Sequence, residues 1–406
     1  MIINPVPALF AEEQLLRKRL TILIAIFCLF FLIWIFSSRS SQPDPAQADE
    51  IIQTAERLLA DQQRPEAIDM LLNLLVVAPD NQKATFLLGH CYYQQKNYEQ
   101  AANQFGSILP ESEYYQPALL NSAKACLKSA RMEQAEQALK QFLHNAPASP
   151  SVITELQWLY FNQFRVREAK RLLSEALPLS ENPYPLLYHL LQIEYFPPIA
   201  QESISLLKRI NDAEPGQASI VLALGYCYWK LGQTDRAREL IEQSLAINPR
   251  RLETILTAAD FYLETGDLEK SQKLLQPEKD YPTELQQQLQ QDDRWHFLKS
   301  RLHFQNDDLH QSLEEIQLAL KLNPSEIKYL QHRGSVYQAS GEYESAQKQF
   351  QQTKKMARSY QELYKFVASG ALDKPSKEDC QQIAAHLETL GKTQQALLWK
   401  KIAASI

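Results

Sequence analysis

The chain contains little glycine, few cysteines and no marked excess of either charge. Only ten of its 406 residues are glycine, and the five cysteines are scattered without a Cys-x-x-Cys pair. This argues against a disulfide framework and against a zinc knuckle. The formal net charge of -6 does not favour nucleic-acid binding, which usually needs a basic patch. The chain also lacks a phosphate-binding Gly-Lys-Ser/Thr motif, a Ser-centred elbow and a His-Glu-x-x-His motif. We therefore expect no enzyme, cofactor, metal or small-molecule substrate.

One long apolar run lies near the amino terminus. Residues 20–36 read "LTILIAIFCLFFLIWIF", and 19 uncharged residues separate Arg19 from Arg39. As a helix they would span roughly 28 Å, close to the ~30 Å hydrocarbon core of a bilayer. We expect a single transmembrane helix at 20–38, between a short tail (1–19) and a linker (39–47). A cleaved signal peptide, which would make the protein secreted, is the alternative.

The basic residues around this run predict its orientation. Arg17, Lys18 and Arg19 precede it, and only Arg39 follows closely. The positive-inside rule then places the amino terminus in the cytoplasm and the rest of the chain on the extracytoplasmic side of an inner or plasma membrane. The alternative is a chain that faces the cytoplasm as an adaptor for a membrane enzyme complex.

The rest of the chain repeats with a period of 34 residues. The similar stretches "GHCYYQQKNYEQA" (89–101) and "GYCYWKLGQTDRA" (225–237) begin four such periods apart. Seven units fill 48–285, and after a Gln-rich insertion (286–292) two more fill 293–360. We expect 361–376 to be an extra helix or linker, and 377–406 to be a partial repeat that forms a C-terminal cap.

Small residues recur at fixed positions of these units. The twentieth position is Ala or Ser in all ten units, as expected where two helices cross closely. The eighth position is Gly, Ala or Ser in most units, and the twenty-fourth is apolar in nine of the ten. Four units have glycine at the fifteenth position, where a turn would separate two helices: Gly232, Gly266, Gly341 and Gly391. The pattern predicts a helical hairpin in each unit. The unit at 184–217 departs from it, with Leu191 at the eighth position and "FPPIA" at the turn.

A helix-turn-helix unit of this length and pattern resembles the tetratricopeptide repeat. The stretch 220–249 matches it closely through Leu224, Gly225, Tyr228, Gly232, Ala237 and Pro249. The resemblance covers nearly everything from 48 to 406. It implies an all-α fold, a right-handed α-solenoid of about ten helix-turn-helix repeats, here preceded by the transmembrane helix.

Apolar and aromatic residues recur at the fifth, ninth and twelfth positions, which share one face of the first helix. The resemblance implies that this face lines a concave groove for peptide ligands. We expect a partner-binding groove formed by Phe86, His90, Tyr93, Lys124, Lys128, Trp158, Phe161, Tyr188, Tyr195, Tyr226, Trp229, Phe297, Arg301 and Phe304. The alternative is that these side chains pack against neighbouring helices.

The cysteines and histidines of the repeats predict no reactive centre. Cys91, Cys126, Cys227 and Cys380 fall on first helices at positions that pack between helices, where cysteine behaves as a small apolar residue. His296, His303 and His310 recur every seven residues, but two helical turns (~10 Å) separate neighbours too far for one metal ion. The sequence thus predicts a membrane-anchored, non-catalytic scaffold that binds proteins or peptides.

Overall fold

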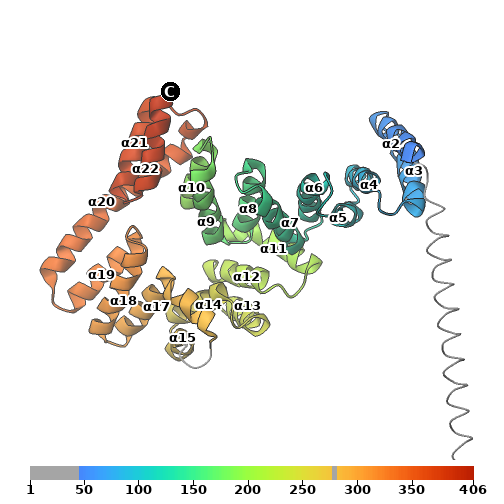
Figure 1. Cartoon of the computed structure of the whole chain (residues 1–406). Coiled ribbons are helices and arrows are strands. Elements are labelled where there is room, and N and C mark those ends of the chain that lie inside the picture. Colours follow the sequence, from blue (N-terminus) through green and yellow to red (C-terminus); the bar gives the residue numbers. More distant parts are fainter. Residues whose placement is uncertain (1–44, 277–280) are drawn as a thin grey trace, which may run out of the picture. The chain divides into compact units, whose positions relative to one another are not determined.

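The computed structural model describes residues 45–276 and 281–406, which form two compact units that divide after Ala125. Within these ranges the chain is all-helical and contains no strand (Figure 1). The first unit contains α2 (Pro45–Ala60), α3 (Arg64–Val77), α4 (Gln82–Gln94) and α5 (Tyr98–Gly106). Helix α6 (Tyr115–Lys128) contains the boundary between the units.

The second unit continues with helices that pair in sequence. They are α7 (Met132–Asn145), α8 (Pro150–Asn162), α9 (Val166–Ala176), α10 (Tyr184–Tyr195), α11 (Ala200–Ala213), α12 (Ala218–Lys230), α13 (Thr234–Ile247), α14 (Leu252–Thr265), α15 (Leu268–Leu275), α16 (Thr283–Gln290), α17 (Asp293–Gln305), α18 (Leu309–Leu322), α19 (Ile327–Ala339), α20 (Tyr343–Ala368), α21 (Lys377–Thr389) and α22 (Thr393–Ser405). Pairs such as α12 with α13 and α17 with α18 pack as antiparallel hairpins, so the predicted helical hairpin is confirmed.

Close helix crossings explain the small residues of the repeat. Nine of the ten residues at the twentieth position are buried, and only Ser203 is half-buried. At the eighth position, a Cβ added to Gly89 would lie 2.7 Å from the ring of Phe105, and one added to Gly225 would lie 3.3 Å from the backbone nitrogen of Ile241. Phe105 and Ile241 occupy the twenty-fourth position of the same units. The eighth position must therefore be small because the twenty-fourth residue packs directly over it.

Nine of the ten turns at the fifteenth position have the same left-handed backbone conformation, whether or not glycine occupies them. The four glycines expected there have φ values between 74° and 80°. Five further units adopt φ values between 59° and 62° at Gln62, Lys96, Ala130, Phe164 and Asp307. A residue with a Cβ pays roughly 1–2 kcal/mol for this conformation. The hairpin geometry therefore imposes strain in five units, and one of the strained residues is the bulky Phe164.

The unit at 184–217 forms a different kind of hairpin. Its turn, with Pro197 and Pro198, has no left-handed residue, and the large Leu191 replaces the small residue needed for a close crossing. Here α11 packs against α12, whereas α10 packs against α9, α20 and α22 (Figure 1). This departure from the repeat lets α10 contact helices that are far from it in the sequence.

Aromatic residues make up much of this long-range contact. The rings of Tyr195 and Tyr360 lie 4.4 Å apart, and the Tyr360 hydroxyl donates a hydrogen bond of 3.0 Å to the backbone oxygen of Glu194. The Glu194 carboxylate forms ion pairs with Lys170 and, at 3.3 Å, with Lys392. Burial opposes ionisation of Glu194, but the two lysines more than offset it and lower its pKa. We call this set of contacts between α10 and α20–α22 the closure contact.

Two segments near the C-terminus differ from the sequence expectation. Residues 361–368 continue α20 as one 26-residue helix and do not form a separate one. Met356 and Leu363 are buried along this helix, so the apolar pattern of the second helix simply extends. The last unit, expected to be partial, is a complete hairpin of α21 and α22, because the final residues still bury Ala396, Trp399 and Ala403.

The Gln-rich insertion lies largely in α16, which buries Leu285 and Leu289.

The predicted transmembrane helix at 20–38 lies outside the described residues, as do the tail before it and most of the linker after it. In the ranges 45–276 and 281–406, no helix combines the length and apolar character that crossing a membrane requires.

Candidate functional site

Most of the predicted groove residues contact neighbouring helices. In the first unit, the ring of Phe86 lies 5.6 Å from that of Phe105 on α5 and 5.2 Å from that of Tyr114. His90 also approaches the side-chain amide of Asn121 at 3.3 Å, and burial lowers the pKa of its imidazole. Tyr93 stacks edge-on against Tyr98, with 5.3 Å between the rings. Lys124 is half-buried.

The predicted groove residues of α17 likewise pack against the next repeat. The ring of Phe297 lies 4.5 Å from that of Tyr329, and His332 contacts both Phe297 (5.6 Å) and Phe304 (5.4 Å). Arg301 forms an ion pair with Asp260 on α14. Burial and the charge of Arg301 lower the pKa of His332 to about 4.

The predicted residues of α8 and α10 divide between exposed and buried positions. Trp158 is 44% exposed and Phe161 is half-buried, while Lys128, at the end of α6, is exposed. Tyr188 donates a hydrogen bond of 3.2 Å to Asp373, and Tyr195 is buried in the closure contact.

On α12, Tyr226 and Trp229 form an aromatic pair with 5.8 Å between their rings. The Lys230 ammonium lies 4.0 Å from the centre of the Trp229 ring and 5.3 Å from that of Tyr226, which is cation–π geometry. Tyr226 also lines a cavity of about 440 Å³. It is the only one of the fourteen predicted groove residues that contributes to this cavity.

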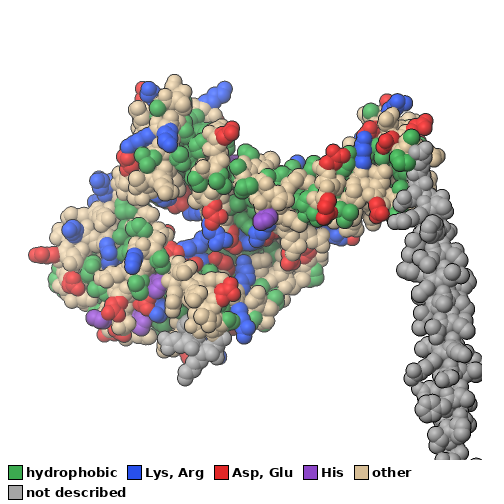
Figure 2. Space-filling view, in the orientation of Figure 1, with side chains coloured by type: hydrophobic (Ala, Val, Ile, Leu, Met, Phe, Trp, Pro, Cys, Tyr) green, Lys and Arg blue, Asp and Glu red, His purple; other side chains and the backbone are tan. Residues whose placement is uncertain are grey.

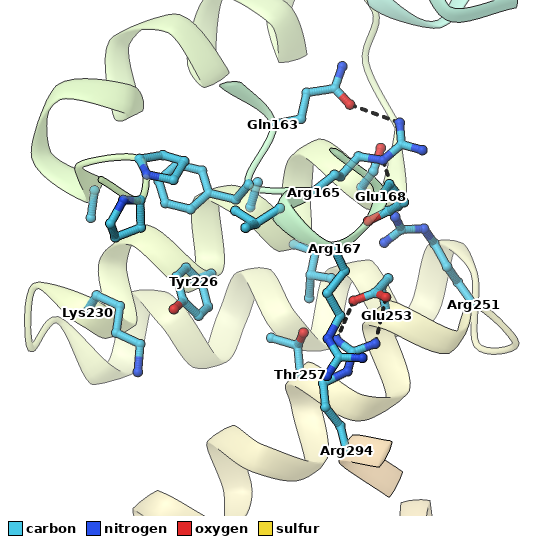
Figure 3. Close-up of a pocket in the computed structure, with 18 residues that line it drawn as sticks. Gln163, Arg165, Arg167, Glu168, Tyr226, Lys230, Arg251, Glu253, Thr257 and Arg294 are labelled. Atoms are coloured by element: carbon cyan, nitrogen blue, oxygen red, sulfur yellow. Dashed lines mark hydrogen bonds and ion pairs between the residues drawn. The ribbon is translucent and has the colours of Figure 1, made fainter. Parts of the chain in front are cut away.

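This cavity, which we call the basic pocket, lies within the second unit (Figure 3). It is formed by the turn and first residues of α9, the Pro197–Pro198 turn, one face of α12, and the starts of α14 and α17. Its apolar wall includes Phe164, Pro197, Pro198, Leu222 and Tyr226. Five cationic side chains also line it: Arg165, Arg167, Lys230, Arg251 and Arg294. Figure 2 shows Lys and Arg side chains gathered in this hollow, between the positions of α9 and α12 in Figure 1.

Three of the arginines are held by carboxylates. Arg165 pairs with Glu168 at 2.9 Å and also bonds to Glu136 on α7. Arg294 donates two hydrogen bonds of 2.7 Å to Glu253. Bidentate pairs of this kind fix the position of a guanidinium group as well as stabilising it. These two arginines, and Arg167 with its own carboxylate partner, are therefore rigid parts of the pocket wall.

Arg167 connects the pocket to a distant repeat. It donates hydrogen bonds of 2.7 and 3.0 Å to the two carboxylate oxygens of Asp293 on α17. Asp293 also accepts hydrogen bonds from Asn323 (2.9 Å) and from the hydroxyl of Tyr329 (3.0 Å). Burial alone would raise the pKa of Asp293, but these partners lower it to about 2.

Arg251 differs from the other arginines of the pocket. It is half-buried, and within the described part of the chain its side chain makes no hydrogen bond or ion pair. Burial lowers the pKa of its guanidinium, and the charges of Glu168 and Glu253 only partly compensate. Among the pocket's arginines, Arg251 is therefore the one whose hydrogen-bond donors are unused, while the exposed Lys230 lies over the rings of Trp229 and Tyr226.

These arginines were not among the residues predicted from the sequence. The stretch "RVREAKR" (165–171) carries four basic residues in seven, and Arg250 and Arg251 follow Pro249. These local charge clusters were a usable signal. They lie in turns and helix starts, however, and only the curvature of the solenoid brings Arg165, Arg251 and Arg294 to one cavity.

The cysteines and histidines lie where the sequence suggested. Cys91, Cys126, Cys227 and Cys380 are buried, as predicted. Burial raises the pKa of the Cys91 thiol to about 11 and that of Cys227 to about 12. His296 lies 2.6 Å from Glu315, an interaction within the helical hairpin. Among residues 45–276 and 281–406, no group of three or more His, Cys, Asp or Glu side chains could hold a metal ion.

Comparison with known proteins agrees with this fold. Residues 52–115 and 200–247 each match a family model described as Tetratricopeptide repeat. The chain is 34% identical over 86 residues to "Uncharacterized protein ycf37" of Pyropia yezoensis, a match that covers 20% of this chain and 48% of that protein. The chain thus spans about half the length of this relative.

Two solved structures align with large parts of the chain at low identity and with TM-scores below 0.5. The APC/C hetero-tetramer Cut9–Hcn1 aligns over 88% of this chain and 90% of that one, with 11% identity and a TM-score of 0.41. YrrB, described as a TPR protein with an unusual peptide-binding site, aligns over 49% of this chain and 85% of its own, with 14% identity and a TM-score of 0.28. The two family matches show that the chain contains tetratricopeptide repeats, and its all-helical solenoid is an architecture suited to binding proteins or peptides. Proteins of this class are typically non-catalytic scaffolds.

Proposed function

We propose that this protein is a membrane-anchored, non-catalytic scaffold that binds a segment of a partner protein in its second unit. The observation that carries the proposal is the basic pocket, a cavity of about 440 Å³ with an apolar wall and fixed polar groups. Binding sites commonly combine a largely apolar concave surface with a few convergent polar groups. Tyr226 is the predicted groove residue that lines this pocket and would contact such a segment.

Co-purification with two matched variants tests this function. The full chain, extracted in detergent, should retain its partner, and Tyr226→Ala should weaken retention by about tenfold, since truncating an aromatic anchor typically costs over ~1 kcal/mol of binding. Tyr343→Ala is the control, because Tyr343 is 71% exposed and lies at the start of a second helix, away from the basic pocket. Equal retention by both variants would contradict the proposal.

We further propose that residues 20–38 anchor the chain in the lipid bilayer and that the repeats lie on the extracytoplasmic side. The support is the length of the apolar run and the basic residues that precede it. A reporter enzyme that is active only after export, fused at the C-terminus, should be active. An inactive reporter on a membrane-bound chain would instead favour the cytoplasm-facing adaptor. Release of the chain into the soluble fraction would favour a cleaved signal peptide.

A further inference from the structure

The unpaired Arg251 indicates what kind of segment the basic pocket accepts. A half-buried guanidinium loses water contacts, and leaving its donors unused costs free energy that an anionic acceptor would restore. Arg165, Arg167 and Arg294 have no acceptor to offer Arg251, because a guanidinium group only donates hydrogen bonds. The carboxylates near them are already bonded to these three arginines. Arg251, whose hydrogen-bond donors remain unused, therefore lines the cavity itself.

Two helix starts add to the positive potential at this place. Helix α9 begins at Val166 and α14 at Leu252, and the residues before them, Arg165 and Arg251, provide no side-chain cap for the first backbone N–H groups. Such helix starts carry partial positive charge and favour anions. Arg251 thus lies at the start of α14, and the start of α9 lines the same cavity.

The opposite side of the pocket is apolar. Phe164 and Tyr226 face each other with 5.7 Å between their rings, and Pro197 and Pro198 continue this wall. Figure 3 shows Tyr226 and Lys230 on one side of the pocket and Arg165, Glu168 and Arg251 on the other. A ligand that fills the pocket would need a carboxylate on one side and an apolar group on the other.

We propose that the basic pocket binds an acidic segment of the partner protein, with an Asp or Glu carboxylate on Arg251 and a neighbouring apolar side chain against Phe164 and Tyr226. This inference rests on the proposed function and specifies the chemistry of the partner. A planar guanidinium can hold a carboxylate through two parallel hydrogen bonds. A bilayer surface fits less well, because the site is a cavity that a single side chain can enter and a broad membrane surface cannot.

Selection from a displayed random-peptide library tests this inference and does not require the partner to be identified first. The full chain in detergent should enrich peptides in which Asp or Glu lies beside an aromatic or aliphatic residue. The Arg251→Ala chain should lose this acidic preference, whereas Arg250→Ala, which changes the exposed neighbouring arginine, should keep it. Circular dichroism would verify that each variant is folded, and Arg251 has no hydrogen-bond partner whose loss should unfold it.

An enriched peptide then allows a quantitative comparison by fluorescence anisotropy. We expect about tenfold weaker binding to Arg251→Ala, a smaller loss with Arg251→Lys, and a similar tenfold loss when Gln replaces the acidic residues of the peptide. Enrichment of peptides without acidic residues, or equal affinity for Arg251→Ala and Arg250→Ala, would overturn this inference and leave the proposed function intact. No enrichment of any peptide would contradict the proposed function as well. Displacement of the peptide by short-chain phosphatidylglycerol at lower concentrations than by free peptide would identify a lipid ligand and also overturn the inference.

Discussion

Asp293 joins two repeats that a simple solenoid would keep apart. Stacked repeats usually contact only their nearest neighbours, yet Asp293 on α17 accepts two hydrogen bonds from Arg167 on α9. We predict that Asp293→Asn, which keeps the shape of the side chain and removes its charge, destabilises the second unit. It should also make unfolding less cooperative, because α9 and α17 would no longer be coupled.

The lowered pKa of Asp293 gives the size of the expected loss of stability. Burial opposes ionisation, but Arg167, Asn323 and Tyr329 more than offset it and move the pKa from 3.8 to about 2. This difference corresponds to about 2.4 kcal/mol, at about 1.36 kcal/mol per pKa unit. Since the pKa is lower in the folded state, the stabilisation is fully present above about pH 4 and is lost as the pH falls towards 2. The variant should lack this part of the pH dependence.

Urea unfolding of the full chain in detergent, followed by far-UV circular dichroism, measures both effects. At neutral pH, Asp293→Asn should lower the free energy of unfolding by about 2 kcal/mol. Glu239→Gln, which removes an exposed carboxylate of α13, is the matched control and should change it little. Equal stability of the two variants would refute the reasoning, as would parallel acid-denaturation curves for Asp293→Asn and the unmodified chain between pH 4 and 2.

Three further predictions concern packing, backbone conformation and thiol reactivity. Gly89→Ala should destabilise the first unit by about 1–3 kcal/mol. The control Gly106→Ala should not, because its added Cβ would meet nothing within 4 Å, and equal melting temperatures of the two variants would contradict this prediction. Lys96→Gly should raise the free energy of unfolding by about 0.5–1 kcal/mol, because it relieves a left-handed conformation, and a loss of stability would oppose that explanation. Cys91 and Cys227, whose pKa values burial raises, should react with a thiol reagent near pH 8 only after unfolding, as peptide mass spectrometry can check; rapid labelling of the folded chain would disprove their burial.

The sequence predicts most of the fold because each repeat is built from the same local contacts. The small twentieth residues and the glycines at the eighth position mark the helix crossings directly. The left-handed turns were visible only where glycine occupies them. At Lys96 and Phe164 the hairpin imposes the conformation on residues that do not favour it, so no residue type reveals it.

The basic pocket could be predicted only in part. Tyr226 lies on the first-helix face that the repeat pattern identifies, but most other residues of that face pack against neighbouring helices. The sequence did show that the unit at 184–217 is irregular. Its consequence, a turn at Pro197 and Pro198 that lines the same cavity as Tyr226, depends on how successive repeats curve. Arg251 and Arg294 reach the cavity through the same curvature, which no local pattern encodes.

Site-specific photo-crosslinking tests the central proposal most directly. A benzophenone amino acid would replace Tyr226 in the basic pocket or, as a control, the exposed Tyr343, in the full chain expressed in its own membrane. We predict a discrete protein adduct from position 226 that is absent from position 343 and weakened by Arg251→Ala. An adduct of equal yield from both positions, or none from position 226, would contradict the binding of a protein segment in this pocket.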